Sequence, residues 1–186
     1  MTYEELLIEA DANNLTVKEK PLPISKGRIK GNRIAIRKDM TETEKACVLA
    51  EELGHYYSAV GNILDQSSIE NRKQEMQGRI LAYNKQVGLR GIIDAYLHNC
   101  KNLFETAEYL GVTEEFLNDS LTYYTNKYGV CTQLDNYVIF FQPNILLRFI
   151  QNCHGVMLHM MQQYLIFCNH IMYAVGVGIT LTMMML

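Results

Sequence analysis

The sequence predicts an α+β domain that is mostly helical, and three observations carry this prediction. Capping signals precede several amphipathic stretches, an alternating apolar run marks a hairpin near the N-terminus, and a β-rich run ends at Pro143. The chain has 186 residues, of which 48% are hydrophobic and 20% are charged. This composition suits a chain that folds around a core, and it excludes a disordered polymer.

The N-terminal part is expected to form a helix followed by a hairpin. Thr2 and Glu5 have the spacing of a capping box, which predicts a helix that ends at about Ala12. Two prolines then break the chain. The stretch GRIKGNRIAIRK alternates apolar with polar residues around a Gly31-Asn32 turn, which is typical of a small hairpin or a pair of edge strands.

Further helices are expected in the middle of the chain. Two more capping boxes are present, Thr41 with Glu44 and Ser67 with Glu70. They predict a helix that reaches about Ala59 and another from about Ile69 to Val87. Shorter elements are then expected, namely helices near 91–99, 103–110 and 114–127 and a strand over 136–142.

The composition changes sharply near the C-terminus. No acidic residue follows Asp135, no basic residue follows Arg148, and seven of the ten methionines lie between Met157 and Met185. We therefore divide the chain into a domain over 1–144 and an apolar tail over 145–186. Three interpretations of the tail stay open: a membrane-anchoring helix, a helix buried against the domain or in a dimer, and a segment foreign to the domain, such as an out-of-frame extension.

Charge and cysteine usage indicate a cytoplasmic protein. The net charge of −3 gives no general attraction to nucleic acid or anionic lipid. The five cysteines are odd in number, widely scattered and without a C-x-x-C pair, which favours a reducing compartment. The first residues, MTYEELLIEAD, are acidic where a signal peptide is basic and then apolar.

The helix after Thr41 carries the candidate chemistry. At ~100° per residue, Glu51, Glu52 and His55 share one arc opposite the broad apolar side. Glu51 and His55 are one turn apart and can reach a single metal ion, whereas Glu52 is offset toward a water on that ion. This is the geometric logic of H-E-x-x-H, with a carboxylate at the first ligand position.

Spacing alone leaves a plainer interpretation open. Two glutamates and a histidine on a polar helix face are more often simply solvated, although Val48 in the same arc indicates a partly covered face. The following helix offers Glu75 as a third ligand, but Glu75 and Arg79 also have the spacing of a surface ion pair. The remaining histidines are more often structural than ligands and are assigned no role.

Three runs resemble the ImmA/IrrE metallopeptidases of phages and integrative mobile elements: TETEKACVLAEELGHYYSAVGNI, NRKQEMQGRILAYN and ETAEYLGVTEEFLNDSLTYYTNKYG. The resemblance covers roughly residues 1–142. It implies a zincin-like domain in which Glu51, His55 and Glu75 bind the metal and Glu52 is the general base. It also implies a substrate, a helix-turn-helix repressor that is cleaved to release the genes of the element.

Glu51 departs from the family pattern, which most often has His at this position. A set of two carboxylates and one imidazole is harder than a set of two imidazoles and one carboxylate, so Mn²⁺ or Fe²⁺ competes with the expected Zn²⁺. We therefore expect a metal-dependent endopeptidase. The first alternative is a weak or inactive relative that acts by binding the repressor.

A transcriptional regulator is the second alternative. The segment ETAEYLGVTEEFLNDSL fits a helix-turn-helix pattern, with Gly111 at the turn position. However, residues 105–119 contain five acidic residues and no Lys or Arg, and DNA binding depends on basic side chains that neutralise phosphates. No direct nucleic-acid contact is therefore expected, and membrane contact through the tail stays possible.

Overall fold

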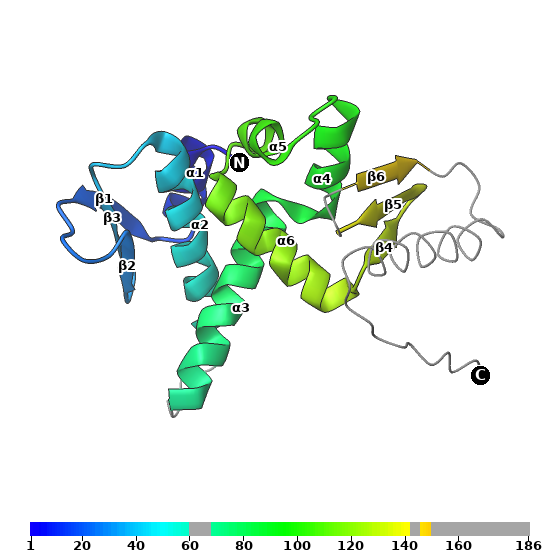
Figure 1. Cartoon of the computed structure of the whole chain (residues 1–186). Helices are drawn as coiled ribbons and strands as arrows, with labels where there is room; N and C mark the ends of the chain where they lie inside the picture. Colours follow the sequence, from blue (N-terminus) through cyan, green and yellow to red (C-terminus); the bar gives the residue numbers. More distant parts are fainter. Residues whose placement is uncertain (60–67, 142–145, 150–186) are drawn as a thin grey trace.

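Two three-stranded sheets lie at opposite ends of the molecule, with helices between them (Figure 1). The structure is a computed structural model and describes residues 1–59, 68–141 and 146–149. The described elements are α1 (Tyr3–Ala12), β1 (Thr16–Lys20), β2 (Gly27–Lys30), β3 (Arg33–Arg37), α2 (Glu42–Ala59), α3 (Ser68–Gln86), α4 (Gly88–Leu97), α5 (Leu103–Leu110), α6 (Glu114–Tyr128), β4 (Cys131–Leu134), β5 (Tyr137–Phe140) and β6 (Leu146–Phe149). This confirms an α+β fold that is mostly helical.

Capping boxes begin the first two helices, as the sequence predicts. The Thr2 hydroxyl accepts a hydrogen bond from the backbone N–H of Glu5, whose carboxylate accepts one from the N–H of Thr2. Thr41 and Glu44 repeat this exchange at α2, at 2.8 and 3.2 Å. The predicted box of Ser67 with Glu70 lies outside the described side chains.

The N-terminal sheet has the strand order β1-β3-β2. Strands β2 and β3 form the predicted antiparallel hairpin, and Gly31 takes a φ of +59° at its turn. Strand β1 pairs in parallel with β3 and was not predicted, because Val17 is the one apolar side chain of TVKEK. Its partner β3 follows β2 in the sequence, so no local signal reveals the pairing of β1 with β3.

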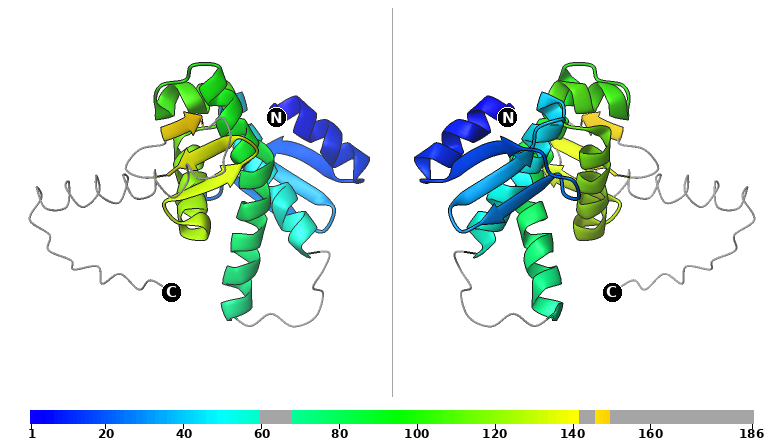
Figure 2. Two further views of the ribbon diagram at one scale, coloured as in Figure 1. Left: turned by 90° about the vertical axis from the view of Figure 1, so that its right-hand side faces the viewer. Right: turned by 90° about the vertical axis from the view of Figure 1, so that its left-hand side faces the viewer.

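Helices α1 and α2 pack against one face of this sheet (Figure 2). The strand β3 turns Ile34 and Ile36 into the core, where both are fully buried. Helix α2 meets them with Leu49 and Leu53, which are also fully buried. Apolar burial therefore fixes which face of α2 points inward and leaves its polar arc facing β2 and α3.

A polar cluster joins the first three helices. The Tyr57 hydroxyl donates to Glu9 Oε1 at 2.7 Å and accepts a hydrogen bond from Asn13 Nδ2 at 3.1 Å. Lys85 of α3 also donates to the Glu9 carboxylate. Burial, together with the Glu9 contact, raises the pKa of Tyr57 to about 12, so its hydroxyl stays protonated and serves packing.

Helices α2 and α3 approach until their backbones touch. A Cβ atom on Gly54 would lie 2.1 Å from the carbonyl oxygen of Gly78, and a Cβ on Gly78 would lie 2.2 Å from His55 Nδ1. A side chain at either position would force the helices apart. Two glycines therefore set the distance between the polar arc of α2 and the facing residues of α3.

The C-terminal sheet has the order β4-β5-β6 and is antiparallel throughout. The predicted strand over 136–142 corresponds to β5, whereas β4 and β6 were not predicted. Strand β6 lies beyond residue 144, so sheet pairing continues past the proposed domain boundary, which stays a prediction. The rest of the tail, 150–186, lies outside the described residues. Of the helices that the structure describes, none has the length and apolar character needed to cross a membrane.

The helix-turn-helix pattern is present as α5 and α6. Gly111 ends α5 in the left-handed conformation at φ +66°, and Thr113 caps α6. Helix α6 buries Phe116 and Leu117 in the core and exposes Glu114, Glu115 and Asp119. The exposed face of the second helix is therefore acidic, which disfavours DNA binding by this unit.

Replacing Gly54 with alanine tests the contact between α2 and α3. The added methyl collides with backbone, so we expect Gly54→Ala to lower the free energy of unfolding by about 2 kcal/mol or more, despite the better helix propensity of alanine. Chemical denaturation measures the change. Gly91→Ala in α4 is the matched control, since its methyl meets only the end of the Leu110 side chain, with Cδ2 at 3.1 Å, and equal losses in both variants would contradict the close contact.

Candidate active site

The polar arc of α2 is covered by strand β2. A Cβ atom on Gly27 would lie 2.4 Å from Val48 Cγ1 and 2.7 Å from Glu52 Oε1. Val48 is buried at 7% exposure, and Glu51, Glu52 and His55 are each half-buried. The interpretation as a freely solvated helix face is therefore wrong, and Val48 was the sequence signal that indicated this.

Glu52 points toward β2 and is held there by the strand backbone. The N–H of Ile29 donates a hydrogen bond to its carboxylate. Burial raises the pKa of Glu52 to about 7, with the charges of Glu51 and Glu75 adding to the effect and the Ile29 hydrogen bond opposing it. Glu52 can thus gain and lose a proton near neutral pH.

His55 of α2 and Glu75 of α3 meet across the glycine contact. His55 Nε2 lies 3.3 Å from Glu75 Oε2, while Arg79 Nε donates to the other carboxylate oxygen at 3.1 Å. The structure therefore shows the ion pair of Glu75 with Arg79, while the other carboxylate oxygen faces the histidine, and the role of Glu75 as a metal ligand stays a prediction. Arg79 holds the carboxylate in this orientation.

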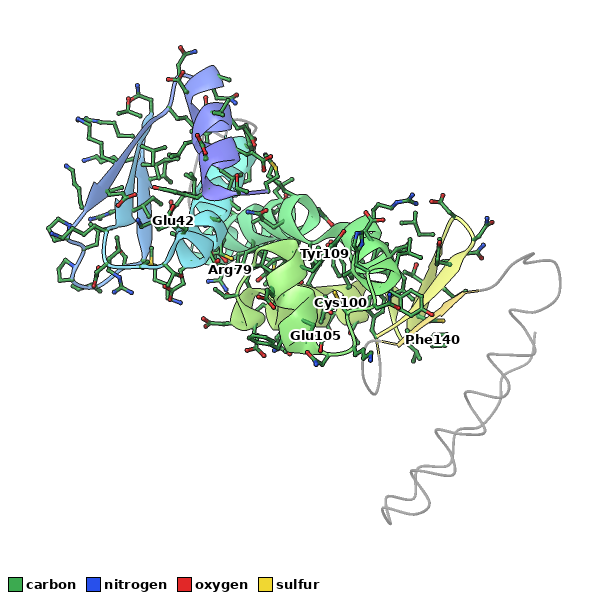
Figure 3. The ribbon with its side chains drawn as sticks, turned by 90° about the horizontal axis from the view of Figure 1, so that it is seen from above. Glu42, Arg79, Cys100, Glu105, Tyr109 and Phe140 are labelled. Carbon is green, nitrogen blue, oxygen red and sulfur yellow. The ribbon has the colours of Figure 1, made fainter. Side chains whose placement is uncertain are left out.

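Glu51 lies in the electrostatic field of these groups. Burial raises its pKa, the charge of Arg79 opposes that rise, and the carboxylates of Glu75 and Asp119 add to it. Arg79 lies near the centre of the molecule when it is seen from above (Figure 3). The half-buried carboxylate of Glu51 and the exposed carboxylates of Glu75 and Asp119 thus lie near one guanidinium, and such a cluster favours an added cation.

The donor chemistry and one distance fit a divalent metal ion. Two ligands on a tetrahedral zinc with bonds of about 2.0–2.1 Å lie about 3.3 Å apart, which is the separation of His55 Nε2 and Glu75 Oε2. Among the described residues, however, no group of three His, Cys, Asp or Glu side chains is arranged to hold a metal. The structure brings His55 and Glu75 together, and the full set with Glu51 stays a prediction.

Sequence reasoning missed three contributors to this site. Ile29 orients Glu52 through its backbone, which no side-chain pattern reveals. Gly54 and Gly78 allow the close helix contact, and glycines inside two predicted helices were an available signal, since each costs about 1 kcal/mol relative to alanine.

The raised pKa of Glu52 makes stability depend on pH. In the folded state the pKa is about 7 and in the unfolded state about 4.5, so folding favours the protonated form, and stability falls as pH rises between these values. We expect Glu52→Gln, measured by thermal unfolding of chelator-treated protein, to be more stable than wild type at pH 8 by up to about 3 kcal/mol. Below about pH 4.5 the advantage should vanish. An advantage that does not change with pH would show that the carboxylate is not desolvated.

Comparison with known proteins places this geometry in a family. The family model described as the IrrE N-terminal-like domain, peptidase M78, matches residues 7–122. The matched segment includes α2, α3, α5 and the first part of α6, and it contains every candidate site residue. No curated protein matches the chain, and no solved structure matches it.

Proposed function

The chain belongs to the M78 peptidase family of IrrE N-terminal-like domains, and on that premise we propose that it is a metal-dependent endopeptidase. One observation carries the proposal: the α2–α3 contact brings His55 within 3.3 Å of Glu75. Glu52 lies beside this pair with a pKa near neutrality. Metal-assisted peptide hydrolysis requires protein ligands for the metal and a nearby group that can move a proton, and these residues supply a ligand pair and a carboxyl group of that kind.

Glu51, His55 and Glu75 would hold the metal. A zincin-like arrangement with Zn²⁺ is proposed, and Mn²⁺ or Fe²⁺ is a competitor because two of the three ligands are carboxylates. When bound, a divalent cation supplies Lewis acidity that polarises the scissile carbonyl and acidifies water. Arg79 keeps one Glu75 oxygen occupied, so the other remains directed at His55.

Glu52 would move the proton. As a carboxylate it accepts a proton from the attacking water, and as a carboxylic acid it gives that proton to the leaving amine. The Ile29 N–H anchors the side chain during both steps. A pKa near the working pH lets one residue serve as base and then as acid.

Strand β2 offers a guide for an extended substrate. It is an edge strand, and the N–H of Arg37 donates to the carbonyl of Lys26 at 2.9 Å, which fixes the hydrogen-bonding register of the hairpin. In that register the backbone groups of Gly27 and Ile29 face away from β3, and of these the Ile29 N–H is engaged by Glu52, which leaves the Gly27 groups and the Ile29 carbonyl for a peptide. We propose that a peptide lies along this edge, where its scissile bond would be near Glu52.

The proposed substrate is a helix-turn-helix repressor of a phage or mobile element, cleaved in the cytoplasm. This proposal is supported by the family match and by the resemblance of residues 1–142 to ImmA/IrrE peptidases. An inactive relative that only binds the repressor is the second candidate. The observation in its favour is that Glu51 does not complete a three-ligand group with His55 and Glu75 in the described residues.

Metal content tests the ligand set. We expect His55→Ala to abolish stoichiometric metal binding with little loss of secondary structure, and Glu51→His to tighten zinc binding because imidazole suits zinc better than carboxylate. Mass spectrometry of metal-loaded protein and circular dichroism measure these outcomes. His98→Ala is the control, because His98 is an exposed residue at the end of α4. Unchanged metal content in His55→Ala would refute the assignment.

Cleavage tests the role of Glu52. Glu52→Gln keeps the size and removes the basicity, so metal and substrate binding should be retained while cleavage falls by about 10²-fold or more. The assay incubates the enzyme with the repressor encoded beside its gene and follows the products by gel and mass analysis. Glu108→Gln on the exposed surface of α5 is the control. Binding without cleavage by the metal-loaded wild type would favour the inactive relative.

A further inference from the structure

The outer face of the N-terminal sheet is densely basic. The register of β1, β3 and β2 places on this face six basic residues, Lys18, Lys20, Arg28, Lys30, Arg33 and Arg37. The register turns them away from the face on which Ile34 and Ile36 pack against the helices. Thr16 and Ala35 are the remaining members, so the face holds no acidic, aromatic or large apolar side chain. We call these eight residues the outer basic face.

Most of these charges have no ion-pair partner in the part of the chain that the structure describes. Arg37 makes an ion pair with Asp39 at 3.8 Å, and the other five basic residues pair with no residue that the structure describes. The one acid of β1, Glu19, lies on the opposite face and pairs with Lys45 at 3.1 Å. The positive charge of the face is therefore not neutralised locally.

Like charges also lie directly opposite one another on neighbouring strands. Lys30 pairs in register with Arg33, and Lys20 pairs with Arg37, an arrangement that destabilises a sheet. Lysines on edge strands discourage the pairing of one sheet edge with another. This accounts for the lysines on the edge strands β1 and β2. Arg33 and Arg37 lie on the central strand, which has no free edge to protect from association. Their repulsion with Lys30 and Lys20 therefore has no such explanation, and it favours an anionic partner.

We propose that the outer basic face binds the phosphate backbone of duplex DNA without regard to sequence. Arginine and lysine neutralise phosphates, and the planar guanidinium suits phosphate oxygens. The face measures about 10 Å across three strands and about 13 Å along them, which is room for several phosphates. The net charge of −3 does not oppose this, because acids are excluded from the face.

The composition of the face selects duplex DNA over other anions. Single-stranded nucleic acid is held by aromatic side chains that stack on bases, and the face has none. Stable binding to a membrane surface also needs apolar side chains that enter the bilayer, and the face itself has no large apolar side chain. Backbone contact with a duplex needs only the cations that are present.

DNA on this face would leave the candidate active site accessible. Glu52 contacts the sheet at Gly27 and Ile29, which alternate along β2 with Arg28 and Lys30 and so lie on the opposite face. One sheet thus separates the two functions. The proposal does not depend on peptidase activity.

Fluorescence anisotropy with a short labelled duplex tests the proposal on the full chain. We expect micromolar binding at about 50 mM salt, with log K falling against log salt at a slope of about −3 to −5 for three to six neutralised phosphates. The triple variant Lys18→Gln/Arg28→Gln/Arg33→Gln should bind at least tenfold more weakly, with a slope shallower by about 3. Thermal melts confirm that each variant is folded.

A second triple variant, Lys73→Gln/Lys101→Gln/Lys127→Gln, has the same net charge but keeps the outer basic face, and it should bind within about twofold of wild type. Equal weakening of both triple variants would show that only net charge matters and would overturn the proposal. Absence of binding at low salt would also overturn it. Binding to phosphatidylserine vesicles in place of the duplex would assign the face to a membrane instead.

Discussion

The backbone contact between α2 and α3 at Gly54 and Gly78 is the constraint on which the candidate site depends. Glycine inside a helix costs about 1 kcal/mol relative to alanine, and this protein accepts that cost on both sides of one contact. The close approach lets the side chain of Glu75 reach His55 from the neighbouring helix. The cluster of Glu9, Tyr57 and Lys85 secures the same helix pair at the α1 side.

The site concentrates negative charge where water is partly excluded. Glu51 and Glu52 both have raised pKa values, first because they are buried and then because carboxylates lie close to one another. Such an arrangement costs stability and is typical of positions kept for chemistry. Arg79 offsets part of that cost and at the same time fixes the orientation of Glu75.

Two described surfaces carry charge of opposite sign. The exposed face of α6 carries Glu114, Glu115 and Asp119, and Asp119 extends the negative field toward Glu51. The outer basic face is its counterpart on the N-terminal sheet. A slightly acidic average therefore conceals two surfaces of opposite sign.

The sequence by itself determined the features that arise within one segment. Capping boxes at Thr2 and Thr41, the β2–β3 hairpin and the arc of Glu51, Glu52 and His55 all follow from interactions over a few residues. The tertiary structure alone decided that Ile29 would hold Glu52, that Glu75 would face His55 and that β1, β4 and β6 would be strands. The physical reason is that a short strand, or a side chain on another helix, acquires its role from partners distant in sequence, and chain folding supplies those partners.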